Sequence, residues 1–264
     1  MHLSKIRHGY NLLGRFNNYL PSNTRVRYNG KKFNEVNSVM NHVFNFLNSP
    51  TQIKSMVNNE INMKNKFDIH SPLFKNQVIA NCYPCSKDNL INSISNYKNR
   101  RTKSSIETKL NIFLKISNLI ENKYYDKLLA SIIVNQGKNL MEAELDATEL
   151  IDFLRFNIYY AIQMYKNQPR NNLEENIINS TEYIPLDGFV SSITPFNFSA
   201  IAGNLASLPL IFNNFVSWKP SPNSYLSNKL IYDILIEAGV SQNNLDFVIY
   251  DGKKYFDIIS KNSD

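Results

Sequence analysis

The chain has 264 residues, of which 43% are hydrophobic and 12% aromatic. This composition suits a globular protein with one large domain or two small ones, and it excludes an intrinsically disordered chain. Lysine and arginine total 29 against 22 acidic residues, and this moderate excess does not by itself indicate a nucleic-acid or membrane partner.

The first 34 residues form a basic segment without a single acidic side chain. Apolar residues such as Leu13, Phe16 and Leu20 alternate with the basic ones, a composition typical of a mitochondrial transit peptide. A simple basic tail explains the same residues equally well. We therefore set residues 1–34 apart from residues 35–264.

The next part of the chain carries weaker patterns. Residues 33–66 read as polar, weakly helical and peripheral, whereas residues 69–93 predict a strand, a turn and a helix beginning near Ser86. Cys82 and Cys85 lie in this part, and a lone CxxC is typical of either a redox pair or half a zinc site. Because no second CxxC and no spaced histidine pair occur, we interpret them as ordinary reduced thiols and predict no metal site.

Helical periodicity dominates the middle of the chain. Two helical segments, interrupted near Asn122, precede a long helix predicted over residues 139–165. Its apolar stripe recurs at alternating steps of four and three, at Ala147, Ile151, Leu154, Ile158, Ala161 and Tyr165. The opposite side carries Glu142, Asp146 and Glu149, which periodicity alone assigns to a solvated face.

The last part of the chain, from Gly188 onward, alternates strands and helices with short links. Strands are predicted in "GFVSSITPF", "FVSWKP" and "LDFVIYD", with helices in "AIAGNLASLPLIFNN" and "SYLSNKLIYDILIEAG" and a stop at Gly239. This order predicts a parallel sheet. The expected fold class is therefore α/β, with a helical N-terminal part leading into a doubly wound parallel sheet.

Polar side chains follow two of these strands. Asn197 comes after the first and Lys219 ends the second, and open parallel sheets bind ligands beyond the carboxyl ends of their strands. An amide at this edge suits a developing oxyanion, and an ammonium suits a ribose hydroxyl or a phosphate. No GxGxxG or Walker A sequence occurs. The alternative is that Asn197 caps the following helix and that Lys219 is a surface lysine.

Three blocks of sequence resemble the aldehyde dehydrogenase superfamily. "GFVSSITPFNFSAIAGNLASLPLIFNNFVSWKPS" is similar to its strand–PxNF–helix–strand–WKPS block. "VNQGKNLMEAELDATELIDFLRFNIYYA" and, more weakly, "SPLFKNQVIANCYPCSKDNL" resemble the branch that oxidises glutamate γ-semialdehyde. The resemblance covers roughly residues 69–264. It implies an aldehyde dehydrogenase-like, Rossmann-like domain, here incomplete, with residues 35–264 as part of an NAD-binding domain.

The resemblance also implies a chemistry. In this branch a cysteine thiolate attacks the aldehyde formed from 1-pyrroline-5-carboxylate, the thiohemiacetal passes hydride to NAD, and a glutamate activates water to release glutamate. The implied catalytic residue of this chain is Asn197, which stabilises the oxyanion. The implied cofactor-binding residues are Ile193, Thr194, Lys219 and Ser221, and those lining the aldehyde pocket are Glu149 and Phe198. The small, uncharged Ser221 leaves the choice between NAD and NADP open.

Several sequence features that the branch uses do not occur here. They are a Phe-Thr-Gly-Ser turn, a glutamate in a Gly-Gly-Lys context and the nucleophilic cysteine. We therefore expect the chain alone to be catalytically inactive, and its last strand, near Phe247, to leave an open sheet edge. The alternatives are a non-catalytic remnant that acts through a partner, a different aldehyde dehydrogenase branch, or a basic nucleic-acid module.

The expected ligand is a small-molecule aldehyde, with no nucleic-acid partner. No membrane span is predicted either, because no apolar run reaches the roughly 18 residues that one needs. A homo-oligomer is expected for a full-length enzyme. The branch implies the mitochondrial matrix, with the cytoplasm as the alternative compartment.

Overall fold

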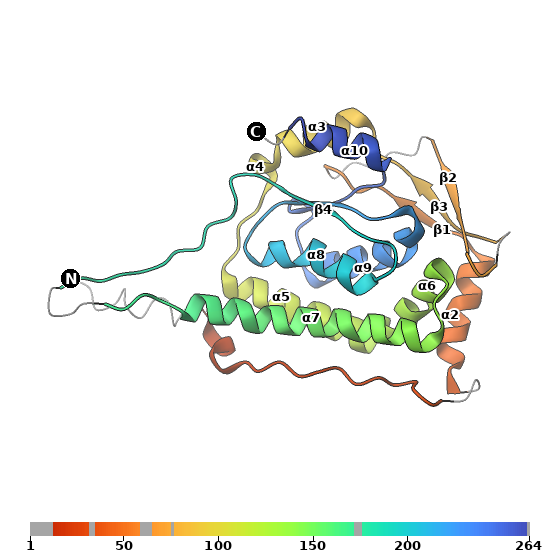
Figure 1. Cartoon of the computed structure of the whole chain (residues 1–264), viewed down its shortest axis with the longest axis horizontal. Coiled ribbons are helices and arrows are strands. Elements are labelled where there is room, and N and C mark those ends of the chain that lie inside the picture. The colour runs from red at the N-terminus through yellow and green to blue at the C-terminus, as the bar shows by residue number, and fades with distance from the viewer. Residues whose placement is uncertain (1–12, 32–34, 59–64, 75–76, 172–175, 263–264) are drawn as a thin grey trace.

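The computed structural model of the chain describes residues 13–31, 35–58, 65–74, 77–171 and 176–262. Two three-stranded sheets and their helices make up this part of the molecule (Figure 1). The strands are β1 (Thr51–Lys54), β2 (Phe67–His70), β3 (Val78–Tyr83), β4 (Val190–Ile193), β5 (Val216–Lys219) and β6 (Leu245–Phe247). The helices are η1 (Gly14–Asn18), α2 (Asn37–Asn48), α3 (Lys87–Ser95), α4 (Tyr97–Arg100), α5 (Ile106–Leu119), η3 (Ile120–Tyr124), α6 (Tyr125–Gln136), α7 (Leu140–Lys166), α8 (Ser199–Ile211), η4 (Pro222–Ser224), α9 (Tyr225–Ala238) and α10 (Gly252–Ile259). None of the helices in the described ranges has both the length and the apolar character that crossing a bilayer requires.

The second sheet confirms the predicted α/β class. β5 lies between β4 and β6 and is parallel to both. Helices α8 and α9 contact each other on one face of this sheet. On that face the rings of Tyr232, from α9, and Phe247, from β6, lie 5.4 Å apart. On the opposite face, near α3 and α10 (Figure 1), the Tyr255 hydroxyl donates a 2.9 Å hydrogen bond to the Ser217 hydroxyl of β5. Helices therefore cover both faces of this sheet.

The N-terminal part contains a sheet of its own, and its strand β3 confirms the strand predicted within residues 69–93. β1 runs parallel and β2 antiparallel to the central β3. β1 has four residues, of which Ile53 alone is buried, so it is too short to give a periodic signal. The helix predicted from Ser86 is confirmed, because the Ser86 hydroxyl caps α3 by accepting from the Asn89 N–H at 3.1 Å.

The edge of β6 is covered. Met56, just after β1, pairs with Phe247 in an antiparallel bridge, and each residue donates a 2.9 Å backbone hydrogen bond to the other. Phe247 is fully buried. The expectation of an open edge near Phe247 is therefore wrong. The residue that pairs at this edge comes from far earlier in the chain, which no local pattern reveals.

Helix α7 packs closely on α8. Helix α7 begins with a full capping box. The Asn139 side chain accepts a hydrogen bond from the Glu142 backbone N–H, and the Glu142 side chain accepts one from the Asn139 backbone N–H. The predicted stripe from Ala147 to Ala161 is buried. A Cβ added at Gly203 of α8 would meet the Leu150 side chain of α7 at 2.8 Å, so any larger residue there would force Leu150 to move.

The basic N-terminal segment is part of the folded unit as far as it is described. Leu13 and Phe16 are buried in the main core, and the chain then runs along α7 (Figure 1). There the Thr24 N–H donates to Asp152 at 2.7 Å, and the Tyr28 N–H donates to Glu144 at 2.9 Å. Residues 13–31 thus pack against the rest of the described chain, and the boundary that we set after residue 34 stays a prediction.

Both cysteines are free, buried thiols. Burial raises the pKa of Cys82 and of Cys85 to about 12, so at pH 8 roughly one thiol in 10⁴ is a thiolate. We expect iodoacetamide to label neither thiol in the folded chain within a time that labels both in urea, as measured by intact mass. Rapid labelling of either cysteine in the native chain would contradict their burial.

Candidate active site

The ends of β4 and β5 bring the predicted residues to one edge of the sheet. Ile193 and Lys219 are partners in the strand register, and the Thr194 N–H donates to the Lys219 carbonyl at 3.2 Å. Asn197 follows β4 by a short turn, and Ser221 follows β5. This is the edge at which parallel sheets bind ligands.

The side chain of Asn197 is exposed and free at this edge. α8 begins at Ser199, and its N-cap position, Phe198, provides no side-chain hydrogen bond. Asn197 therefore does not cap α8, and that alternative is wrong. Its amide group hydrogen-bonds to nothing in the described part of the chain, so both N–H donors can face a ligand.

Lys219 is not a surface lysine. It is 5% exposed, and its ammonium donates one hydrogen bond, 3.3 Å long, to the Pro220 carbonyl. Burial lowers the pKa of Lys219, and Asp251 partly opposes this. An ammonium group has three donor hydrogens. Lys219 therefore has spare donor capacity inside the protein, an arrangement that weakens the fold and suits a ligand.

Replacing Lys219 with methionine is expected to leave the fold at least as stable. The apolar stem stays while the desolvated charge goes, so at pH 7 Tm should equal that of the parent or exceed it by up to about 4 °C. Because the folded-state pKa of Lys219 lies below its usual 10.5, the unfolded chain binds more protons between the two values. The parent therefore gains stability as pH rises to 10.5, and the difference in Tm between Lys219→Met and the parent shrinks.

Calorimetry between pH 7 and pH 10.5 measures this difference. Lys254→Met, at an exposed lysine of α10, is the control for the loss of a lysine charge and should leave Tm at pH 7 unchanged. A clear loss of stability in Lys219→Met at pH 7 would contradict the assignment of Lys219 as an unsatisfied buried charge.

The remaining residues predicted for the cofactor are not equally available. Ile193 is half-exposed, and Ser221 is partly exposed after β5. The Thr194 hydroxyl, by contrast, is buried and accepts a 3.0 Å hydrogen bond from the Trp218 indole N–H. Its position is thus fixed by the neighbouring strand, and the role of Thr194 at the cofactor stays a prediction.

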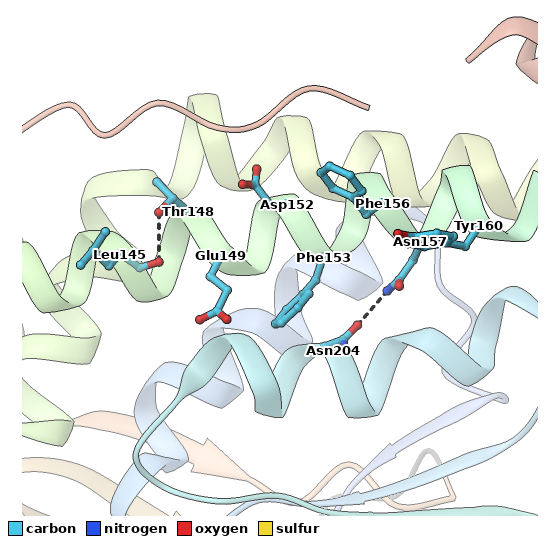
Figure 2. Close-up of a pocket in the computed structure, with 9 residues that line it drawn as sticks. All are labelled: Leu145, Thr148, Glu149, Asp152, Phe153, Phe156, Asn157, Tyr160 and Asn204. Atoms are coloured by element: carbon cyan, nitrogen blue, oxygen red, sulfur yellow. Dashed lines mark hydrogen bonds between the residues drawn. The ribbon is translucent and has the colours of Figure 1, made fainter. Parts of the chain in front are cut away.

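A groove of 690 Å³ runs along α7 and contains Glu149. Figure 2 shows Glu149 and Phe153 pointing toward α8, whereas Asp152 points toward the N-terminal segment. The groove is lined by Leu145, Thr148, Glu149, Asp152, Phe153, Phe156, Asn157, Tyr160 and Asn204. Glu149 is exposed. Burial raises its pKa, as does Asp146, while Lys138 lowers it. A partly apolar groove with two carboxylates suits a small polar molecule with an alkyl chain.

The acidic residues of α7 do not form one solvated face. Glu142 and Glu149 are exposed, whereas Asp146 is buried and accepts hydrogen bonds from the Ser199 and Ala200 backbone N–H groups at 3.0 and 2.8 Å. The prediction of a solvated Asp146 is therefore wrong. The one signal in the sequence is indirect: the residue before Ser199 is Phe198, which cannot cap a helix, so a cap had to come from elsewhere.

The fold and this edge define an aldehyde dehydrogenase-like domain. The sequence matches the aldehyde dehydrogenase family over residues 60–264, and the chain belongs to that family. It is 51% identical over 138 residues to a probable delta-1-pyrroline-5-carboxylate dehydrogenase of Schizosaccharomyces pombe, covering 52% of this chain and 25% of that protein. The mitochondrial delta-1-pyrroline-5-carboxylate dehydrogenase of Homo sapiens is 42% identical over 156 residues, covering 59% and 27%.

A solved structure gives the same picture. The delta-pyrroline-5-carboxylate dehydrogenase of Mycobacterium tuberculosis, bound with NAD and cobalamin, superposes with a TM-score of 0.83 at 27% identity, over 90% of this chain and 46% of that one. The chain thus spans about a quarter of the length of the curated relatives that it matches, and under half of this solved chain.

Proposed function

We propose that this chain supplies the oxyanion-donor and cofactor-side part of an NAD-dependent dehydrogenase that oxidises L-glutamate γ-semialdehyde, formed from 1-pyrroline-5-carboxylate, to glutamate. The observation that carries the proposal is that a free Asn197 amide and a buried, under-satisfied Lys219 follow and end, respectively, two adjoining strands. The names of the relatives support this branch of the family.

Asn197 has the chemistry of an oxyanion donor. Its two amide hydrogens have no acceptor in the described chain, so they can hydrogen-bond to an aldehyde oxygen as negative charge develops on it. Such a donor stabilises the transition state more than the substrate. The exposed ring of Phe198 lies next to it in the chain.

Lys219 fits the ribose side of a dinucleotide. Its spare ammonium hydrogens can donate to ribose hydroxyls, and the small Ser221 leaves room next to them. Ile193 offers an apolar surface at the same edge. When bound, NAD accepts the electrons of the oxidation. We expect Lys219→Met, which should not weaken the fold, to weaken NAD binding at least about tenfold, since hydrogen bonds to charged groups stabilise by about 1.5–3 kcal/mol.

Glu149 fits the other end of the substrate. Its exposed carboxylate in the groove can pair with the α-ammonium group of glutamate γ-semialdehyde, while Phe198 contacts the methylene chain. We further propose a homo-oligomer in the mitochondrial matrix. The relatives of Homo sapiens and Emericella nidulans are named mitochondrial, and the first 34 residues have the composition of a transit peptide.

A chimaera tests the proposed function. The matched segment of the Schizosaccharomyces pombe relative is replaced by that of this chain, and NADH formation is followed with 1-pyrroline-5-carboxylate and with propanal. We expect turnover with a clear preference for 1-pyrroline-5-carboxylate in kcat/KM. The 264-residue chain alone should form no NADH, because its two thiols are buried with a pKa of about 12.

Two outcomes would overturn the proposal. A folded chimaera that binds NAD without oxidising any aldehyde would favour a non-catalytic remnant. A chimaera that prefers propanal would assign the chain to a different aldehyde dehydrogenase branch.

A further inference from the structure

The first turn of α8, next to Asn197, is capped by a different helix. The buried carboxylate of Asp146 on α7 accepts the Ser199 N–H at 3.0 Å with one oxygen and the Ala200 N–H at 2.8 Å with the other. Phe198, at the N-cap position, contributes no side-chain bond. The backbone direction of α8, and with it the turn that carries Asn197, is therefore fixed by α7.

A lysine holds that carboxylate in place. The Lys138 ammonium lies 2.8 Å from an Asp146 oxygen, and both side chains are largely buried. The same ammonium lies 4.5 Å from the centre of the Phe198 ring, within the range of a cation–π contact. One cation thus contacts both the cap of α8 and the residue that follows Asn197.

The backbone at Lys138 is itself rigid. Gly137 ends α6 in the left-handed conformation, with φ of 75° and its N–H bonded to the Ile133 carbonyl, and Asn139 begins α7 with a capping box. Lys138 is the single residue between these two caps. Just before it, the Gln136 amide donates to the Ser199 hydroxyl at 2.6 Å. The junction of α6 and α7 therefore holds the start of α8 at two points.

We propose that Asp146 and Lys138 are positioning residues for the oxyanion donor: together they fix the first turn of α8 and the Phe198 ring, and so aim the Asn197 amide at the aldehyde oxygen. This inference rests on the proposed function of Asn197. A catalytic donor must be held within a fraction of an ångström to act. Asn197 is exposed and bonds to nothing in the described chain, so its order comes from the backbone on either side of it.

The same geometry excludes a rival use of this helix start. Backbone N–H groups at a helix N-terminus commonly bind phosphate. Here the Ser199 and Ala200 N–H groups already bind a carboxylate, whose charge repels an anion. The first turn of α8 is thus a fixed support for the site and not a phosphate cradle.

Amide hydrogen exchange in the full 264-residue chain tests the support directly. Asp146→Asn keeps the shape of the side chain, but it has one acceptor oxygen in place of two and no charge, so it loses at least one of the two N–H bonds and its ion pair with Lys138. We expect the protection of at least one of the Ser199 and Ala200 amides to fall at least tenfold, with α9 amides such as Ile231 unchanged. Lys138→Met, which keeps the apolar stem on Phe198, should give a smaller loss of protection at the same two amides.

Glu144→Gln is the matched control for a purely structural effect. Glu144 is a second buried carboxylate of α7, but it accepts the Tyr28 N–H at 2.9 Å and the Tyr125 hydroxyl at 3.0 Å, and neither partner belongs to α8. Its substitution should lower Tm without changing the relative protection of Ser199 and Ala200. If Asp146→Asn leaves these two amides unchanged, or lowers protection equally in α7, α8 and α9, the positioning role is refuted.

Kinetics of the chimaera separate this inference from the proposed function. We expect Asp146→Asn to lower kcat about 10- to 100-fold while KM for NAD stays within twofold, a loss confined to the transition state. If Asn197→Ala lowers kcat but Asp146→Asn does not, the positioning role fails and the proposed function stands. If Asn197→Ala has no effect on kcat, the role of Asn197 in the proposed function fails, and the positioning role with it.

Discussion

Replacing Asp246 with alanine is expected to lower the free energy of unfolding by about 3–5 kcal/mol, because it leaves a buried guanidinium without its counter-charge. Asp246 lies on β6, an outer strand of the second sheet, and is fully buried. One of its oxygens is 3.0 Å from Arg100 of α4 and accepts the Asn58 N–H at 3.2 Å. The other accepts the Ser93 hydroxyl of α3. The carboxylate thus ties α3 and α4 to the sheet that carries the candidate site.

Burial raises the pKa of Asp246, and its bond to Arg100 lowers it again only in part. The pair therefore contributes little net stability as a pair, whereas a single removal is costly. The double variant Arg100→Met/Asp246→Leu should recover part of the stability that Asp246→Ala loses. Urea unfolding followed by circular dichroism measures both.

The control is an ion pair of the same type at the surface. Lys98 and Asp187 lie 2.6 Å apart with both side chains mostly exposed, and Asp187→Ala should leave the urea midpoint unchanged because water screens such pairs. Equal effects of Asp187→Ala and Asp246→Ala would show that burial is not what makes the Arg100–Asp246 pair matter.

Replacing Asn197 with alanine is expected to lower kcat of the chimaera by about 10²–10³-fold, the effect of removing one oxyanion donor. The binding of NAD should change little, because Asn197 is not among the residues expected to touch the ribose. Asn197→Asp should lose as much, since a carboxylate offers acceptors and a negative charge where donors are needed. Steady-state kinetics with 1-pyrroline-5-carboxylate and NAD measure both variants.

Asn118→Ala, at an exposed asparagine of α5, is the control and should keep the parent kcat. A variant Asn197→Ala whose KM for the aldehyde rises while kcat stays the same would show that the amide binds the substrate in its ground state. Asn197 would then be a binding residue and not an oxyanion donor.

Three acidic residues of α7 show how one helix serves separate tasks. Glu144 binds the N-terminal segment, Asp146 caps α8, and Glu149 faces the groove. They lie within six consecutive residues of the sequence and look alike there. Their roles differ because each points toward a different neighbour of α7, and a helix turns its side chains by about 100° per residue.

The sequence by itself determined what depends on near neighbours along the chain. The helix starts near Ser86 and Asn139, the stop at Gly239 and the buried stripe of α7 are local patterns, and the structure confirms them. The alternation of strands and helices after Gly188 likewise predicted the parallel sheet, and short links between elements left few other topologies. The family resemblance rested on this same stretch and on α7.

Only the tertiary structure decided which polar groups are buried and what they meet. Asp146 caps a helix that lies 53 positions away in sequence, Met56 closes the edge of β6, and residues 13–31 join the core rather than forming a tail. Lys219 proved to be buried with few hydrogen-bond partners, and the Thr194 hydroxyl proved to accept a hydrogen bond from Trp218. Burial and pairing depend on the segments that the fold brings together, and a polar residue in sequence carries no mark of its distant partner.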